Sequence, residues 1–171
     1  MEQAQKNLAA FLSMIREAEG TSGPNGYRTL FGGGLFDSFD DHPRQPIKRK
    51  SGKGYITSTA AGAYKMPVRV WDECHLTIKL PDFSPRYQDE AARFLISRRR
   101  ALWDVFDGRF YSAVGKCNKE WASLPGSPYD QPTINLLEAL ALYTKAGGIN
   151  VEEKPNVQVL DQTTGGKGRR T

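Results

Sequence analysis

The chain has 171 residues, with 24 lysines and arginines against 19 aspartates and glutamates, and therefore a net charge of +5. Hydrophobic residues make up 39% of the chain and charged residues 25%, which indicates one folded domain and excludes global disorder and a coiled coil. No apolar run reaches the roughly 18 residues of a transmembrane helix, and residues 1–8 are too polar for a signal peptide, so we expect the chain to start in the cytoplasm.

The first predicted element is an amphipathic helix over residues 4–19. Its apolar side chains recur at helical spacing and define one buried face: Leu8, Phe11, Leu12 and Ile15. Gly20 ends the helix, because glycine readily adopts the backbone conformation that follows a helical C-terminus.

Residues 21–62 form a segment rich in Gly, Pro, Asn and Asp. Such a composition predicts long loops and short strands, and the apolar pieces at 27–31 and 54–57 are the strand candidates. We interpret the segment as a small β-rich insert.

Helical patterns return after residue 62, and proline and serine mark where helices begin. The predicted helices span 67–75, 85–99, 101–106, 109–123 and 132–146. The fold class is therefore α+β, a helical bundle with a β-rich insert that forms one side of a cleft. Residues 1–150 would be the folded domain, and residues 151–171 are predicted to be a mobile basic tail.

Glu19 continues the apolar stripe of the first helix, four residues after Ile15 and eight after Phe11. A carboxyl group there is buried, lines a cleft, or is solvated at a frayed helix end. Burial and the negative end of the helix dipole both favour its protonated form, which is the form of a general acid. Spacing alone leaves these alternatives open.

A glycosidase usually pairs its acid with a second carboxylate. The next carboxylates in the sequence are Asp37, Asp40 and Asp41, and residues 20–36 contain none. An insert that folds back could bring Asp37 or Asp40 opposite Glu19, so a hydrolase with two carboxylates stays open as an alternative.

Neither a metal centre nor a disulfide framework is indicated. Cys74 and Cys117 lie more than forty residues apart, and His42 and His75 are equally sparse. We expect two buried free thiols, no metal and no cofactor.

Several segments, in this order, resemble the bacteriophage lambda endolysin family over about residues 8–150. They are Arg16-Glu17-Ala18-Glu19-Gly20-Thr21, Gly32-Gly33-Gly34-Leu35-Phe36, Asp41-His42-Pro43-Arg44, Ser58-Thr59-Ala60-Ala61-Gly62-Ala63-Tyr64, Asp82-Phe83-Ser84-Pro85, Arg99-Arg100-Ala101-Leu102 and Trp121-Ala122-Ser123-Leu124-Pro125-Gly126. Any one of these segments would be a weak match, whereas the ordered set is specific.

The resemblance implies a lysozyme-like fold, with residues 1–150 as the catalytic domain, and cleavage of the peptidoglycan glycan strand between N-acetylmuramic acid and N-acetylglucosamine. The family acts as a lytic transglycosylase, which closes the muramic C6 hydroxyl onto C1. Glu19 matches the family's catalytic glutamate. A single glutamate suffices for this chemistry, because it can protonate the leaving oxygen and then accept the hydroxyl proton. The family also implies a holin that releases the enzyme to the periplasm, and we expect a monomer.

Two positions depart from the family pattern. Lys65 stands where the family has Gln, so a group that donates and accepts is replaced by a cation that only donates. Asp130 stands where the lambda-like pattern has Gly. For contacts with the saccharide the candidates are Tyr64, Tyr129 and Gln131, together with Lys65, since sugars stack on aromatic rings and bond to amides and phenols.

Other conspicuous residues have structural interpretations. Trp71, Trp103 and Trp121 lie within helical patterns and are expected in the core. Residues 41–44 are expected to order a loop, because adjacent side chains rarely converge on one substrate.

The sequence contains two groups of clustered basic residues. They are Arg98, Arg99 and Arg100 at a helix end, and Arg44, Lys48, Arg49, Lys50 and Lys53 in the predicted loop region. The helix-end group needs no ligand. The loop group allows a rival function, a nucleic-acid-binding or cell-wall-binding module, but no nucleic-acid motif accompanies it, and attraction to the anionic wall explains it equally well.

Overall fold

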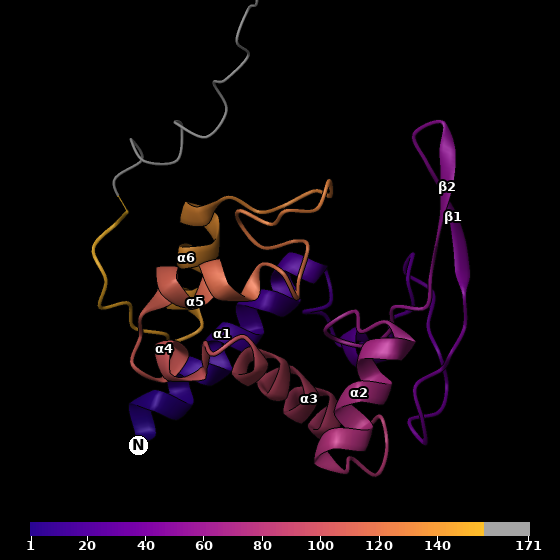
Figure 1. The fold of residues 1–171 in the computed structure, drawn as a ribbon, viewed down its shortest axis with the longest axis horizontal. Coiled ribbons are helices and arrows are strands. Elements are labelled where there is room, and N and C mark those ends of the chain that lie inside the picture. Colours follow the sequence, from indigo (N-terminus) through magenta and orange to yellow (C-terminus); the bar gives the residue numbers. More distant parts are fainter. Residues whose placement is uncertain (156–171) are drawn as a thin grey trace, which may run out of the picture.

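The structure is a computed structural model that describes residues 1–155 (Figure 1). The helices of this part are α1 (Glu2–Glu19), α2 (Val68–Ile78), α3 (Pro85–Arg98), α4 (Leu102–Phe106), α5 (Phe110–Cys117) and α6 (Leu136–Lys145), with a 3-10 turn, η1 (Gly26–Arg28). The strands are β1 (Ile47–Ser51) and β2 (Gly54–Ser58). The α+β architecture is the predicted one.

Helix α1 runs through the bundle and packs against α4 and α6 (Figure 1). Phe11 of α1 meets the rings of Phe110 and Tyr143 edge-on, each with centroids 6.4 Å apart. These buried rings join α1, α5 and α6, and such contacts are worth more than their buried area alone. The apolar stripe predicted for the first helix is therefore the face that builds the core.

A second aromatic cluster seats the insert on α2. The ring of Trp71 contacts Phe83 edge-on at 4.7 Å, and Phe36 from the insert lies 5.8 Å from Phe83. All three rings are buried. This cluster fixes the base of the insert against the helical bundle.

Strands β1 and β2 form an antiparallel hairpin that stands to one side of the bundle (Figure 1). Its residues are almost all exposed, so backbone pairing holds it together. The strand predicted at 54–57 lies within β2. The basic segment at 47–51 is a strand and not the predicted loop, because its charged side chains hide the apolar alternation by which strands are recognised. The piece at 27–31 is not a regular strand, because its first two residues belong to η1 and Thr29 and Leu30 make only isolated bridges.

Two predicted helices are shorter than expected. The prediction 109–123 is wrong beyond Cys117, where the chain turns and Asn118 Nδ2 donates a hydrogen bond to the carbonyl of Pro125. The prediction 132–146 begins too early, because Asn135 caps α6 by accepting a hydrogen bond from the backbone N–H of Glu138. Periodicity located both helices, and local side-chain bonds decided their ends.

The start of the predicted mobile tail is also corrected. Val151 donates its backbone N–H to the carbonyl of Gly108, and Glu152 accepts hydrogen bonds from Ser112 at the start of α5. Residues 151 and 152 therefore belong to the packed structure. Residues 156–171 lie outside the described part, so the remainder of that prediction stays a prediction.

Of the three tryptophans, Trp71 and Trp121 are buried as predicted. Trp103 is not in the core, since 72% of it is exposed on the short helix α4. Its ring lies edge-on to Phe106, with centroids 5.7 Å apart. Among residues 1–155 we find no helix long and apolar enough to cross a membrane.

Candidate active site

Glu19 is the last residue of α1, and the turn after it ties the helix end to the insert. Gly20 adopts a left-handed conformation with φ 71°, which lets Thr21 donate its N–H back to the carbonyl of Arg16 at 2.8 Å. The hydroxyl of Thr21 donates to the carbonyl of Ala63. The carboxyl of Glu19 is therefore held next to the turn that carries Lys65.

This turn, residues 61–66, is anchored from both sides. Gln88 of α3 accepts a hydrogen bond from the N–H of Ala63 at 2.8 Å, and Trp121 Nε1 donates to the carbonyl of Tyr64 at 3.2 Å. Lys65 itself has φ 47°, an uncommon conformation for a residue with a side chain. Its ammonium donates to the carbonyl of Leu30 at 3.2 Å.

The chain between α5 and α6 supplies the opposite side of the site. It leaves the bundle on the side of the hairpin (Figure 1) and brings Ser123 to the end of α1. The hydroxyl of Ser123 donates a hydrogen bond to Glu19 Oε1 at 2.7 Å. One carboxyl oxygen is thus oriented, which leaves Oε2 for the proton of an acid.

These elements enclose an open cavity of about 380 Å³. Its lining consists of Glu19, Phe31, Ile56, Ser58, Ala60, Lys65, Pro67, Glu120, Trp121, Ala122 and Gln131. The helix end, the hairpin and the α5–α6 connection therefore meet around one hollow, with Glu19 and Lys65 on its wall.

The electrostatics of Glu19 favour a proton donor. Burial raises the pKa of Glu19 above its ordinary value, and the hydrogen bond from Ser123 and the positive charge of Lys65 lower it to a smaller extent. Because its pKa is raised, the protonated fraction of Glu19 near neutral pH is larger than that of an exposed glutamate. Glu17, two residues earlier, is exposed on α1.

Glu120 is a second carboxylate on the cavity wall that the sequence analysis missed. Its side chain is almost fully buried, and Arg98 and Arg99 both donate to Oε1, at 2.9 and 2.8 Å. Arg98 also reaches Glu73 at 2.6 Å. Arg98 and Arg99 at the basic helix end therefore form ion pairs within the protein, and the carboxylate of Glu120 is held in these pairs.

The aspartates considered as partners of Glu19 lie elsewhere. Asp37, Asp40 and Asp41 do not line the cavity among the described residues. Asp41 binds Arg44 at 2.7 Å and accepts from Trp71 Nε1 at 3.2 Å. Arg44 also binds Asp72, which confirms the predicted role of residues 41–44 in ordering a loop.

His42 shares that role and is not poised for proton transfer. Its Nε2 lies 2.8 Å from the carbonyl of Met66, and its Nδ1 accepts from the N–H of Arg44. This pair of bonds matches the neutral imidazole with its proton on Nε2. Burial lowers the pKa of His42, which also favours the neutral form.

The predicted saccharide-binding residues line two hollows, and Lys65 belongs to the linings of both. Gln131 lines the cavity with Glu19, as Lys65 does. Tyr129 is 50% exposed on a neighbouring hollow, and its hydroxyl donates to the carbonyl of Lys119. Tyr64 is only 2% exposed, and its hydroxyl donates to Asp89 at 2.7 Å. The structure thus gives Tyr64 a packing and anchoring position in the wall of the neighbouring hollow, outside the lining of the Glu19 cavity.

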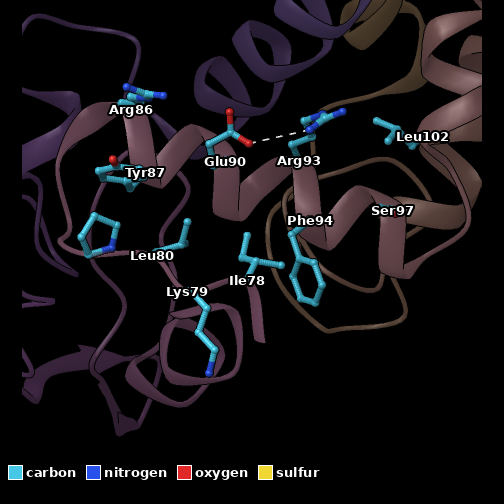
Figure 2. Close-up of a pocket in the computed structure, with 11 residues that line it drawn as sticks. Ile78, Lys79, Leu80, Arg86, Tyr87, Glu90, Arg93, Phe94, Ser97 and Leu102 are labelled. Carbon is cyan, nitrogen blue, oxygen red and sulfur yellow. Dashed lines mark ion pairs between the residues drawn. The ribbon is translucent and has the colours of Figure 1, made fainter. Parts of the chain in front are cut away.

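A larger hollow of about 640 Å³ lies between the end of α2 and α3, and it contains none of these residues. Figure 2 shows its wall, with Glu90 paired to Arg93 and with Arg86 and Lys79 at its edge. Its chemistry is that of a surface groove between helices. Size alone therefore does not identify the active site.

The thiols and histidines form no further site in the described part of the chain. Cys74 and Cys117 are buried and free, and burial raises the pKa of each thiol to about 12. No group of three or more potential metal ligands occurs among residues 1–155. The prediction of buried structural cysteines is confirmed.

A mostly helical α+β domain, with a half-buried glutamate where a helix end meets a hairpin, has the architecture of the lysozyme-like proteins. The match to solved structures confirms this fold: two structures of the lysozyme from bacteriophage lambda superpose with TM-scores of 0.78 and 0.73. Both share 34% identity and cover 85% of this chain and 96% of theirs. The first holds a chitohexasaccharide.

The chain belongs to the endolysin family, whose model matches residues 9–150. The endolysin of Escherichia phage P2 is 36% identical over 157 residues, covering 84% of this chain and 94% of the relative. The endolysin of Escherichia phage lambda is 34% identical over 154 residues, covering 86% and 96%. The predicted resemblance is therefore confirmed over nearly the full length of these relatives.

Proposed function

We propose that this endolysin is a peptidoglycan lytic transglycosylase. It cleaves the glycan strand between N-acetylmuramic acid and N-acetylglucosamine and leaves an anhydro-muramic end, for lysis of the host cell. The observation that carries the proposal is the cavity's acid chemistry: Glu19 is oriented by Ser123 and favoured in its protonated form, while Glu120 is occupied by two guanidinium groups.

The reaction needs only one group that exchanges protons. Glu19 donates its proton to the glycosidic oxygen as the bond from that oxygen to C1 of the muramic residue breaks. The resulting carboxylate then accepts the proton of the C6 hydroxyl, whose oxygen closes onto C1. The nucleophile belongs to the substrate, so no carboxylate has to activate a water molecule.

Hydrolysis by a lysozyme mechanism is the alternative. It requires a second carboxylate, either as a nucleophile about 5 Å from the acid or as a base farther across the site. Glu120 lies on the same cavity wall as Glu19, but its ion pairs with Arg98 and Arg99 stabilise it where it is. This constraint favours transglycosylation over hydrolysis.

Product analysis distinguishes the two reactions. Purified peptidoglycan digested with the enzyme should release muropeptides that end in anhydro-muramic acid and are lighter by one water than hydrolysis products, as measured by mass spectrometry. If the products were mainly muropeptides with reducing ends, and if the Glu120→Gln variant no longer released them, the transglycosylase proposal would be wrong and a lysozyme mechanism would be favoured.

Changing Lys65 to Gln, the family's residue, should shift the pH dependence of cleavage. The positive charge of Lys65 lowers the pKa of Glu19, so its removal raises that pKa further. Glu19 then stays protonated to higher pH, and the alkaline limb of the plot of kcat against pH should move to higher pH. Profiles of both forms on the same peptidoglycan measure this, and an alkaline limb that moves downward or stays in place would contradict it.

We also infer that the enzyme acts as a monomer and reaches the wall after a holin opens the inner membrane, as the family implies. Glycan strands are then its partner, and no nucleic acid is required. Sedimentation of the purified chain, and lysis timing with and without a co-expressed holin, test these two points.

A further inference from the structure

Arg49 of β1 lies on the same face of the hairpin as the cavity. In the register of the two strands it is directly opposite Ile56, and Ile56 lines the cavity with Glu19. Side chains of directly opposed residues share a face of a sheet. Lys48 and Lys50, opposite Thr57 and Tyr55, therefore lie on the other face.

The segment after η1 brings Arg49 and Lys65 together. A Cβ atom built on Gly32 would lie 2.6 Å from Arg49 Cδ, so the arginine crosses the chain directly over this glycine. The next residue back, Phe31, lines the cavity, and the ammonium of Lys65 bonds to the carbonyl of Leu30. Both cations therefore flank one short stretch of backbone at the cavity edge.

These two cations have no carboxylate partner within ion-pair distance among residues 1–155. Burial is the main cause of the lowered pKa of Lys65, the negative charge of Glu19 opposes this shift, and the positive charge of Arg49 adds to it. Glu120 offers no compensation, since Arg98 and Arg99 already neutralise it. A pair of like charges at the edge of a binding cavity is stabilised by an anion from the ligand.

The proposed substrate carries such anions in its peptide stems. The sugar rings are neutral, but the stem attached to each muramic residue has free carboxylates and begins beside the bond that is cleaved. An arginine guanidinium matches a carboxylate with two parallel hydrogen bonds, and a lysine adds a point charge. Both types of group are present at the cavity edge.

We propose that Arg49 and Lys65 form a binding site for a peptide-stem carboxylate, so that this enzyme selects glycan strands that carry charged stems. The inference rests on the proposed function, because it concerns the same cavity and the same substrate. It names the part of the substrate that the chain recognises beyond the sugar backbone.

The test measures binding without turnover, in the Glu19→Gln background. Soluble glycan strands with native stems are compared, at constant ionic strength, with the same strands after their stem carboxylates have been converted to amides. We expect native strands to bind about tenfold more tightly, which is the scale of one hydrogen bond to a charged group. Adding Arg49→Gln or Lys65→Gln should abolish most of this preference.

Arg86→Gln and Lys79→Gln are the matched controls, on the larger hollow shown in Figure 2. Each removes one charge from an exposed residue of the same type, and Lys79 shares the positive φ of Lys65. The controls should keep the preference. Equal affinity of the Glu19→Gln protein for native and amidated strands would overturn the proposal. An equal loss of the preference in the control variants would also overturn it. Failure of transglycosylation would appear separately, in the products of the wild-type enzyme.

Discussion

Replacing Glu19 with Gln should lower the rate of peptidoglycan cleavage by about 10³-fold, within the range that a general acid contributes. The amide keeps the shape of the side chain and can still accept the hydrogen bond from Ser123, but it has no proton of suitable acidity to transfer. Clearing of permeabilised Gram-negative cells by the purified variant measures the loss.

Glu17→Gln is the matched control for this experiment. Glu17 belongs to the same helix but is exposed and absent from the cavity lining. Its variant should clear cells at the wild-type rate, and both variants should melt cooperatively with similar far-UV circular dichroism. A folded Glu19→Gln protein that clears cells at nearly the wild-type rate would refute the catalytic role of Glu19.

Replacing Gln88 with Leu should destabilise the fold by about 3 kcal/mol or more, because three buried or partly buried backbone groups lose their partner. Gln88 accepts from the N–H of Ala63 at 2.8 Å and donates to the carbonyls of Tyr27 and Phe83 at 3.0 and 2.7 Å. For a chain of this size the expected fall in melting temperature is about 10 °C.

Gln5→Leu is the corresponding control, since Gln5 is exposed on α1. Its melting temperature should stay close to that of the wild type. Because Gln88 also anchors the turn that carries Lys65, cleavage by the Gln88→Leu protein should fall even at temperatures where it remains folded. A melting temperature unchanged by Gln88→Leu would show that water replaces these bonds and that the side chain is not a structural anchor.

The elements whose pattern is local could be predicted from the sequence. The spacing of Phe11 and Ile15 predicted α1 and put Glu19 on its apolar stripe, because a helix places residues three or four apart on one face. Composition predicted the insert and the buried thiols. The ordered resemblance to endolysins supplied the catalytic assignment, which spacing alone had left open.

The tertiary structure decided what surrounds Glu19. Ser123 is 104 residues away in the chain, and it reaches the carboxyl only because the predicted long helix stops at Cys117 and turns. Ser123 had appeared in the sequence only as part of the Trp121-to-Gly126 segment that resembles the family. Hydrophobic periodicity cannot predict a contact between Ser123 and Glu19, since it indicates only which face of a single helix or strand is buried.

The tertiary structure also determines which charged side chains lie near Glu19. Glu120 lies on the cavity wall with its carboxylate held by Arg98 and Arg99, although the carboxylates that follow Glu19 in the sequence are Asp37, Asp40 and Asp41. Nearness in sequence is a poor guide here, because carboxylates are brought together by the packing of whole elements. Strand β1 of the exposed hairpin has no apolar pattern to predict it, and only its pairing with β2 sets Arg49 on the side of the cavity. The turn of residues 61–66 sets Lys65 on the cavity wall.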